Sequence, residues 1–288
     1  MENLDLKKII DTLCYRTNLH VCIHDISGIL NLENLSIDIK NKIHSKTFCD
    51  IAKSTQLGFD VCIHCKTSAN DKAVNEKKSF SGYCSYGLFE FVKPVLINNI
   101  PVCIIYIGNI LKDKYISTDK IIKTSEKTKV KSDMLIKELE NSEPYVKNEI
   151  YGNIAGIIEA YIKFAAEKNN FIQNNNYEQR CAQKVESVIE YIDLNFDKNI
   201  SLKKLSKLYF INEKYLGCLF KSKTGMTFRE YLNKVRLDNA AKYLSYTDRT
   251  IINISIDCGF SNVTYFNRMF MKRYNMTPTQ FRKNIKKP

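Results

Sequence analysis

The spacing of hydrophobic and polar positions changes along the chain. In the first 130 residues, strand-like segments alternate with helix-like ones, and strands are expected at Leu19–Asp25, Tyr83–Val92, Pro94–Ile97 and Pro101–Gly108. A tight hairpin turn at Asn98-Asn99 would join the last two strands, and a turn at Ser27-Gly28 would lead from the first strand into another. Helices are expected at Leu6–Thr17, Ser36–Gln56 and Cys65–Lys77.

This mixture predicts one antiparallel sheet with helices around it. No glycine-rich phosphate loop or nucleotide-binding motif accompanies the strands. We therefore expect an α+β protein whose N-terminal part is a PAS/GAF-like antiparallel α/β sensor domain.

The middle of the chain predicts a helical connector. Residues 112–132 are polar and basic and suit a loop with some helix, and a short helix is expected at Ser132–Asn141. Pro144 stands where a long helix would begin. Two glycines on that helix, Gly152 and Gly156, leave two roles open, which are packing on the sensor core and a dimer seam. Residues 169–180 suit a linker, so the expected domains are 1–130, 131–180 and 181–288.

The C-terminal part repeats itself at a spacing of 50 residues. NEKYLGCLFKSKTGMTF (212–228) aligns with NVTYFNRMFMKRYNMTP (262–278), and a short apolar helix pattern precedes each copy. Each copy therefore predicts a short helix, a turn and a second helix, with Asn212 and Ser261 or Asn262 as N-caps. The segment between them, residues 227–246, predicts one helix of about 27 Å, close to one turn of DNA.

The second helix of each copy is amphipathic. At 100° per residue, one face of the first carries Tyr215, Leu216, Leu219 and Phe220, and the opposite face carries Lys214, Gly217, Cys218 and Lys221. In the second copy the corresponding faces carry Tyr265, Phe266, Met269 and Phe270, and Thr264, Asn267, Arg268 and Met271. An apolar face with a short polar face opposite suits a helix that enters the major groove, so the all-α domain is expected to hold two helix-turn-helix units.

Charge agrees with this division. The net charge of the chain is +13, and residues 181–288 hold 20 Lys and Arg against 9 Asp and Glu, or +11. The remaining 24 basic and 22 acidic residues leave +2 for residues 1–180. A basic block at one end favours a polyanionic partner, double-stranded DNA, for the C-terminal domain alone.

The motifs LFKSKTGMTFREYL, GFSNVTYFNRMF and MTPTQFR resemble the DNA-binding module of AraC/XylS transcription regulators over about 100 residues. By position, the resemblance implies base-edge contacts from nine residues: Asn212, Lys214, Tyr215, Gly217, Cys218, Val263, Thr264, Asn267 and Arg268. Gly217 and Cys218 can make few base hydrogen bonds, so the second unit is expected to supply more of the readout. Phosphate contacts are expected from Lys221, Lys223, Arg229, Arg236, Lys272 and Arg273.

The front half resembles the PocR sensory domain from about Lys7 to Tyr115. The resemblance is carried by Cys49, Cys62, Cys84, the pair Gly87-Leu88, and the strand pair with Pro94 and Gly108. It implies a small organic effector such as a short diol or another hydrocarbon derivative. Ser85 departs from the family, which commonly has histidine at this position.

FDVCIHC (59–65) leaves the role of the front-half cysteines open. Zinc needs four ligands, and the candidates are Cys49, Cys62, Cys65, Cys84 and His64. The alternatives are packing as small apolar side chains and a thiol redox role. His20, His24 and His44 form no recognisable pattern, and Cys14, Cys22, Cys103, Cys181, Cys218 and Cys258 look structural or incidental.

Together these features predict a cytoplasmic, non-enzymatic transcription regulator. It would bind DNA sequence-specifically, respond to a small effector in its N-terminal domain, act as a homodimer and, as an activator, contact RNA polymerase. The alternative is a metal- or redox-sensing regulator that uses the N-terminal cysteines, with zinc as the cofactor. A cysteine that accepts methyl groups from damaged DNA does not fit the order of the cysteines, and no membrane segment is expected.

Overall fold

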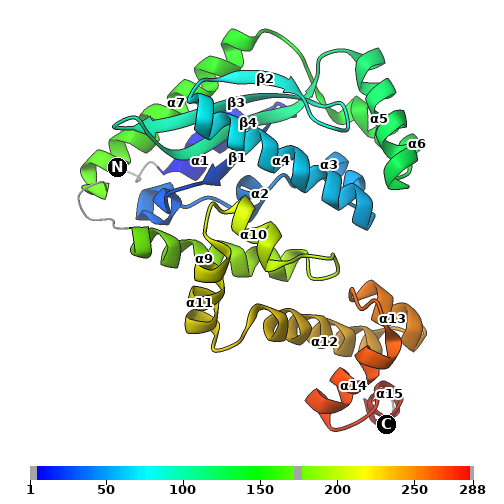
Figure 1. The fold of residues 1–288 in the computed structure, drawn as a ribbon. Coiled ribbons are helices and arrows are strands. Elements are labelled where there is room, and N and C mark those ends of the chain that lie inside the picture. The colour runs from blue at the N-terminus through cyan, green and yellow to red at the C-terminus, as the bar shows by residue number, and fades with distance from the viewer. Residues whose placement is uncertain (1–4, 172–176, 286–288) are drawn as a thin grey trace. The chain divides into compact units, whose positions relative to one another are not determined.

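The computed structural model describes residues 5–171 and 177–285, and its secondary structure is drawn in Figure 1. The chain divides into two compact units. One holds the described residues up to Lys184 together with Lys207–Phe210, and the other holds Val185–Ser206 and the described residues from Ile211 onward. The α+β class is confirmed, with the sheet in the first unit and helices in the second.

A five-stranded sheet forms the centre of the first unit. Its order is β1-β4-β3-β2, with all neighbours antiparallel, and β5 (Glu143–Pro144) adds to β4 in parallel. The other strands are β1 (His20–Asp25), β2 (Phe80–Tyr83), β3 (Phe89–Ile97) and β4 (Ile100–Leu111). Asn98 and Asn99 have φ of 49° and 61°, the left-handed values of a tight hairpin turn, so the predicted turn is confirmed.

One face of the sheet is covered by α1 (Leu6–Leu13) and α7 (Asn148–Lys168). Ile105 and Ile107 of β4 point to this side and pack with Tyr151, Ile158 and Ile162 of α7. Because α7 completes the main core, the expected sensor boundary at residue 130 is wrong and the unit runs through this helix. Pro144 also does not begin the helix, because it pairs with β4 as part of β5.

The other face is covered by α2 (Ile39–Lys42), α3 (Thr47–Ala52) and α4 (Gln56–Glu76). Ala73 of α4 packs there with Val92, Ile104 and Tyr106. The FDVCIHC stretch lies inside α4, which begins earlier than expected because the Thr55 hydroxyl accepts a hydrogen bond from the Gly58 amide.

A second layer of helices packs beyond α4. It consists of α5 (Lys114–Thr128), α6 (Ser132–Glu138) and the 3₁₀ turn η3 (Leu139–Asn141). Their apolar side chains, among them Ile121 and Leu135, pack with Phe48 and Tyr86. At Gly58, an added Cβ would lie 2.2 Å from the Ala52 carbonyl oxygen, so α3 and α4 can approach this closely only with glycine there.

Several expected elements of the first unit are wrong. The turn at Ser27-Gly28 leads into the 3₁₀ turns η1 (Ile29–Asn31) and η2 (Glu33–Leu35), because the Asp25 carboxylate accepts hydrogen bonds from four successive amides. The helix expected at 36–56 is two short helices, and most of the loop expected at 112–132 is α5. The strand expected at 83–92 is interrupted after Tyr83, where Gly87 has φ of 91°.

The second unit consists of helices alone. They are the C-terminal part of α9 (Tyr177–Leu194), most of α10 (Leu202–Leu208), α11 (Glu213–Thr224), α12 (Phe228–Tyr246), α13 (Ile251–Asp257), α14 (Val263–Tyr274) and α15 (Pro278–Ile285). α9 already includes residues 177–180 of the expected linker, and residues 172–176 lie outside the described part of the chain.

The two copies of the sequence repeat form the same hydrogen bonds at the starts of their helices. Asn212 and Asn262 cap α11 and α14 through hydrogen bonds from the amides of Tyr215 and Tyr265, at 3.2 and 2.9 Å. The repeated Met-Thr pairs begin the next helices, where Thr227 bonds reciprocally with Glu230, and Thr277 with Gln280. The two helix-turn-helix units are therefore built by the same local chemistry.

The two turns nevertheless differ. Gly259 has φ of +80°, and an added Cβ would lie 2.6 Å from the Asp197 carbonyl oxygen. In the turn between α10 and α11, the residue with positive φ is Phe210, at +53°. Phe210 stands 49 positions before Gly259, although the sequence repeat has a spacing of 50. One residue, Ile211, separates Phe210 from the N-cap Asn212, whereas two residues, Phe260 and Ser261, separate Gly259 from the N-cap Asn262. The turn before α11 is therefore one residue shorter than the turn before α14.

Candidate functional site

The outer face of α11 carries part of the expected DNA surface. Lys214, Cys218 and Lys221 are exposed, and Tyr215 is half-buried. Asn212 is exposed as well, but its side-chain oxygen is already occupied by the helix cap. Any base readout from α11 would therefore come mainly from Lys214, and Lys221 is suited to a phosphate contact.

Gly217 does not belong to this outer face. A Cβ at this position would lie 3.2 Å from Leu202 Cδ2 on α10, so the position points into the contact between the two helices. The expected base contact at Gly217 is corrected to a packing role, because any longer side chain would press on Leu202.

The outer face of α14 is richer in polar groups. Thr264, Asn267, Arg268 and Lys272 are exposed, and Val263 is half-buried. The Arg268 guanidinium carbon lies 5.4 Å from the centre of the Tyr265 ring, which restrains the arginine without using its hydrogen-bond donors. Asn233 of α12 donates a 2.9 Å hydrogen bond to the Tyr265 hydroxyl, so the ring itself is held in place.

Four of the expected phosphate contacts differ in whether an acidic side chain already pairs with them. Lys272 is exposed, as is Arg229, whereas Lys223 forms an exposed ion pair with Glu186 at 2.7 Å. Arg273 lies 2.6 Å from the Asp238 carboxylate and must leave this partner, or share it, to reach a phosphate.

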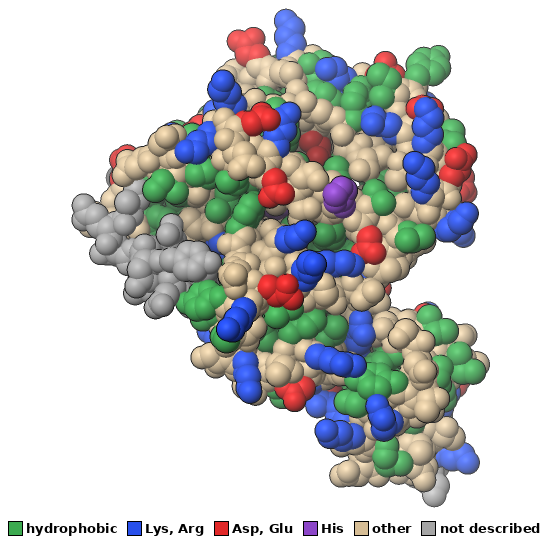
Figure 2. Space-filling model, in the orientation of Figure 1, with side chains coloured by type: hydrophobic (Ala, Val, Ile, Leu, Met, Phe, Trp, Pro, Cys, Tyr) green, Lys and Arg blue, Asp and Glu red, His purple; other side chains and the backbone are tan. Residues whose placement is uncertain are grey.

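Arg236 forms hydrogen bonds within the second unit instead of facing a phosphate. Its guanidinium donates to the carbonyl oxygens of Phe196 and Lys198, at 2.7 and 2.9 Å. These bonds fix the loop after α9 to α12, and the expected phosphate contact is wrong because the donors face inward. Figure 2 shows Lys and Arg side chains over the C-terminal helices on the face in view, with few acidic ones among them.

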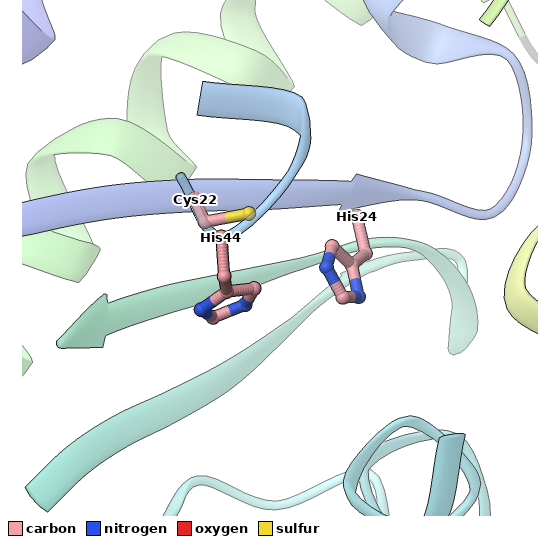
Figure 3. Close-up of side chains that lie close together, drawn as sticks. All are labelled: Cys22, His24 and His44. Atoms are coloured by element: carbon pink, nitrogen blue, oxygen red, sulfur yellow. The ribbon is translucent and has the colours of Figure 1, made fainter. Parts of the chain in front are cut away.

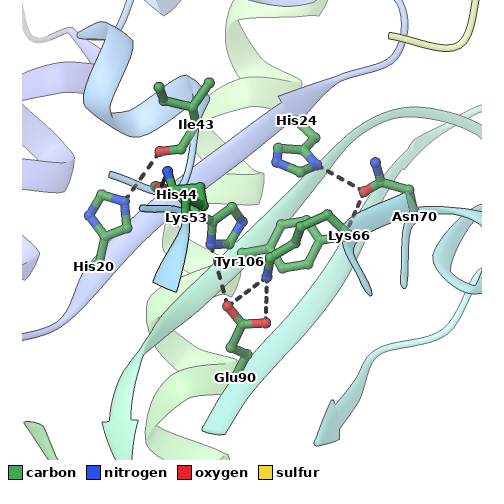
Figure 4. A network of polar contacts seen from close by, with 9 residues as sticks. All are labelled: His20, His24, Ile43, His44, Lys53, Lys66, Asn70, Glu90 and Tyr106. Carbon is green, nitrogen blue, oxygen red and sulfur yellow. Dashed lines mark hydrogen bonds and ion pairs between the residues drawn. The ribbon is translucent and has the colours of Figure 1, made fainter. Parts of the chain in front are cut away.

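A second cluster of functional groups lies inside the first unit, between the sheet and α4. His20, Cys22 and His24 alternate along β1 and all point to the α4 side, where Cys22 faces Tyr106 across the strand pair. Figure 4 shows these histidines with groups from α4, β3, β4 and the segment between α2 and α3. The interior of a domain of this size is normally apolar, so a polar cluster here indicates a function.

The centre of the cluster is a buried ion pair. Lys66 Nζ lies 2.6 and 2.5 Å from the two carboxylate oxygens of Glu90, and 4.5 Å from the centre of the Tyr106 ring. Burial would raise the pKa of Glu90, but Lys66 and His44 outweigh it and hold that pKa well below its usual range. Gly108 makes room for this carboxylate, since an added Cβ would lie 3.2 Å from Glu90 Oε1.

Asn70 connects the histidines to the tyrosine. Its side-chain oxygen accepts hydrogen bonds from His24 Nδ1 at 2.9 Å and from the Tyr106 hydroxyl at 2.6 Å. Its amide nitrogen Nδ2 is buried without a hydrogen-bond partner. A buried donor of this kind is costly unless something accepts from it.

His44 stands on the opposite side of the same ion pair. Its Nδ1 lies 3.4 Å from Glu90 Oε1, and its Nε2 is buried without a partner. Burial lowers the pKa of His20 and of His24 to about 4, and that of His44 well below its usual value. All three imidazoles are therefore neutral near pH 7 and can offer a lone pair.

The cysteines singled out from the sequence behave differently. Cys62 and Cys84 pack against the apolar cluster around Phe48 and Tyr86, and His64 is exposed on α4. Burial raises the pKa of Cys49 and Cys84, and that of Cys62 to about 12, which keeps these thiols protonated and disfavours a redox role. The sulfurs of Cys49, Cys62, Cys65 and Cys84 and the ring nitrogens of His64 do not form a group of three ligand atoms within 4.8 Å, so zinc at this set is not supported.

The described residues instead bring together Cys22, His24 and His44, whose ligand atoms all lie within 4.8 Å of one another. The sequence contained a signal for this group in the alternation of HVCIHD, which places His20, Cys22 and His24 on one face of a strand. His44 could not be found in this way, because it comes from a separate segment between two short helices.

Comparison with known proteins supports both units. The family described as "Sensory domain found in PocR" matches residues 2–170, and the family described as "Helix-turn-helix domain" matches residues 205–284. The first match covers more than half of the chain and includes α7, which agrees with the place of this helix in the core.

Curated relatives resemble about a third of the chain. The HTH-type transcriptional activator RhaS of Mannheimia succiniciproducens is 35% identical over 100 residues, which is 35% of this chain and 37% of the relative. An uncharacterized HTH-type transcriptional regulator of Staphylococcus aureus is 37% identical over 99 residues, or 34% of this chain and 13% of the relative. The chain thus spans only a minor part of these relatives' length.

Solved structures match about a third of the chain. A protein of unknown function from Listeria innocua is 35% identical and matches 35% of this chain and 95% of its own, with a TM-score of 0.34. A probable AraC family transcriptional regulator from Rhodopseudomonas palustris is 28% identical and matches 36% and 97%, also with a TM-score of 0.34.

In the described residues, no helix combines the length and the apolar character that crossing a membrane requires. A sensory unit with a buried polar cluster beside its apolar cores precedes, in the sequence, two capped helix-turn-helix units that expose basic and amide side chains. The chain therefore belongs to the family of the sensory domain found in PocR, and its C-terminal part carries a helix-turn-helix domain.

Proposed function

We propose that this regulator activates transcription when a small, hydroxyl-bearing organic molecule binds inside its sensory unit. The observation that carries the proposal is the buried network around Lys66, Glu90 and Asn70. The unpartnered Nδ2 of Asn70 is a donor directed at no acceptor in the protein, and a hydroxyl oxygen of a short diol would satisfy it.

The paired charges suit a neutral polar effector rather than an ion. Lys66 and Glu90 compensate each other, so the network offers hydrogen bonds without a net charge to neutralise. A diol can donate to the Glu90 carboxylate while it accepts from Asn70. The effector class and the role as an activator, with RNA polymerase as the partner, rest on the family and on this chemistry.

We also propose that the regulator is a cytoplasmic homodimer. On α7, Ile150, Ile157 and Phe164 are 42, 51 and 61% exposed and stand seven residues apart. This spacing places them along one side of the helix, opposite the side that packs on the sheet. A Cβ added at Gly156 would meet nothing within 4 Å, so a second helix could approach α7 closely there.

The test is direct binding of ethane-, propane- and butanediols to the full chain, measured by calorimetry and by thermal stabilisation. Wild type should bind at least one diol, and Asn70→Ala should bind it at least tenfold more weakly, while the surface variant Asn148→Ala should match wild type. Binding that Asn70→Ala leaves unchanged would contradict the placement of the effector. A reporter under a cognate promoter, selected from genomic fragments by the purified protein, then gives the sign of regulation.

A further inference from the structure

Three potential metal ligands converge inside the sensory unit. Cys22 and His24 come from β1, two residues apart on one face, and His44 comes from the segment between α2 and α3. Figure 3 shows the Cys22 sulfur and the two imidazole rings turned toward a common space. Their ligand atoms lie within 4.8 Å of one another. Ligands on a tetrahedral zinc ion stand about 3.3–3.8 Å apart, so the side chains would have to draw together by about 1 Å.

The hydrogen bonds around both histidines select the atom that would bind. An amide oxygen only accepts, so the bond between His24 Nδ1 and Asn70 Oδ1 places the hydrogen on Nδ1 and leaves Nε2 with a lone pair. Glu90 does the same for His44, whose Nδ1 lies 3.4 Å from the carboxylate. Support of one ring nitrogen by a carboxylate or an amide is the usual arrangement behind metal-bound histidines.

The free nitrogen of His44 is an independent sign of a missing ligand. His44 Nε2 is buried and has no hydrogen-bond partner among the described residues. A lone pair left unused in the interior is costly, and a bound cation would satisfy it.

We propose that the sensory unit binds one zinc ion through Cys22 Sγ, His24 Nε2 and His44 Nε2. The set contains one thiolate and two imidazoles, which is a donor combination suited to Zn²⁺. Three protein ligands leave the fourth position of the tetrahedron for a water molecule or another oxygen ligand, as in zinc sites that exchange ligands.

Binding balances without any redox step. The S–H bond of Cys22 breaks, a Zn–S bond forms, and the proton leaves to solvent. The ion and the thiolate together carry one positive charge, and Lys66 with Glu90 add none. An oxygen ligand with a single negative charge in the fourth position would make the site neutral.

The inference goes beyond the proposed effector response and does not depend on it. The effector is assigned to Asn70 Nδ2, whereas the metal is assigned to atoms that Asn70 and Glu90 only orient. Metal binding can therefore be measured without effector or DNA, and a negative result in one experiment leaves the other unaffected.

The experiment uses the full chain, purified without a metal-binding tag and stripped with a chelator. Titration with Co²⁺ should give one equivalent of binding with a thiolate-to-cobalt charge-transfer band and the strong visible bands of a tetrahedral site, and Zn²⁺ should bleach both. Elemental analysis after zinc loading should give one zinc per chain. Wild type without these bands and without bound zinc would overturn the proposal.

Variants then identify the ligands. Cys22→Ser should abolish the charge-transfer band, and His44→Gln should weaken Co²⁺ binding at least tenfold, with circular dichroism confirming that both variants fold. Cys65→Ser and Cys84→Ser are the matched controls from the other cysteine group and should bind as wild type does. A band that survives in Cys22→Ser, or is lost in Cys65→Ser or Cys84→Ser, would overturn the assignment.

Discussion

Lys66 and Glu90 form an ion pair in the interior of the sensory unit, with side chains only 12 and 13% exposed. Removing one member leaves the other as an uncompensated buried charge, which typically costs about 3–5 kcal/mol. We expect Lys66→Met and Glu90→Leu each to lower the unfolding free energy by about this amount, measured by urea denaturation.

The double variant gives the contrast. With both charges gone, Lys66→Met/Glu90→Leu should recover a large part of the loss, because no unpaired charge remains. A double variant as unstable as the sum of the single variants would show that the two residues do not act as a pair.

Arg268 should specify sequence, and Lys272 should not. If Arg268 reads a base, Arg268→Ala should cost about 1–3 kcal/mol at the cognate site and relax the preference at one base pair. Lys272→Ala should weaken binding to all sequences alike and reduce the salt dependence. Competition binding with single-base variants of the operator distinguishes the two patterns, and an equal loss on every sequence would make Arg268 a phosphate contact.

Arg236 should matter for folding rather than for DNA contact. Its two hydrogen bonds join α12 to the carbonyls after α9, and each buried bond to a charged group contributes about 1.5–3 kcal/mol. Arg236→Lys should therefore lower the thermal stability of the DNA-binding unit despite keeping the charge. The exposed Arg229→Lys is the matched control and should leave the melting temperature unchanged.

Glu159 should make the sensory unit sensitive to acid. Burial would raise its pKa, but hydrogen bonds from Lys163 and Lys93, at 2.7 and 3.0 Å, hold it below the usual value. A lowered pKa stabilises the folded state above the ordinary pKa of about 4.3, and that contribution is lost as pH falls through the folded value. Wild type should melt higher than Glu159→Gln at pH 7, and the difference should vanish toward pH 3; a constant difference would contradict this.

The exposed stripe of α7 should hold the dimer together. Ile157 stands at its centre, and a charge there would have to be buried without a partner. Ile157→Lys should shift the protein from dimer to monomer in analytical ultracentrifugation, while Met134→Lys, at another exposed apolar side chain, should not. A monomeric wild type would refute the proposed interface.

The DNA-binding unit could be predicted from the sequence nearly in full. Its helix ends depend on local signals such as Asn212, Asn262 and the Thr227–Glu230 pair, which act within four residues. Gly217 was misassigned because its closest contact, Leu202, lies on another helix.

The sensory site could not be predicted in the same way. The sequence drew attention to FDVCIHC, but the sheet brings together residues from β1, α4, β3 and β4 that are up to 86 positions apart, from His20 to Tyr106. Strand alternation predicts which β1 residues share a face, yet only the strand order decides that Glu90 and Tyr106 meet them. The sequence alone also could not distinguish a metal-binding role of Cys49, Cys62, Cys65 and Cys84 from packing, since a thiol packs as readily as it binds metal.

The unequal turns of the two helix-turn-helix units have an evolutionary consequence. Position 259 admits only glycine, because its backbone is left-handed and a carbonyl oxygen occupies the place of a Cβ. Position 210 already carries a phenylalanine in the same backbone region. The first turn therefore accepts a residue with a side chain, whereas the second does not, so related regulators should keep glycine at position 259 while position 210 can hold other residues.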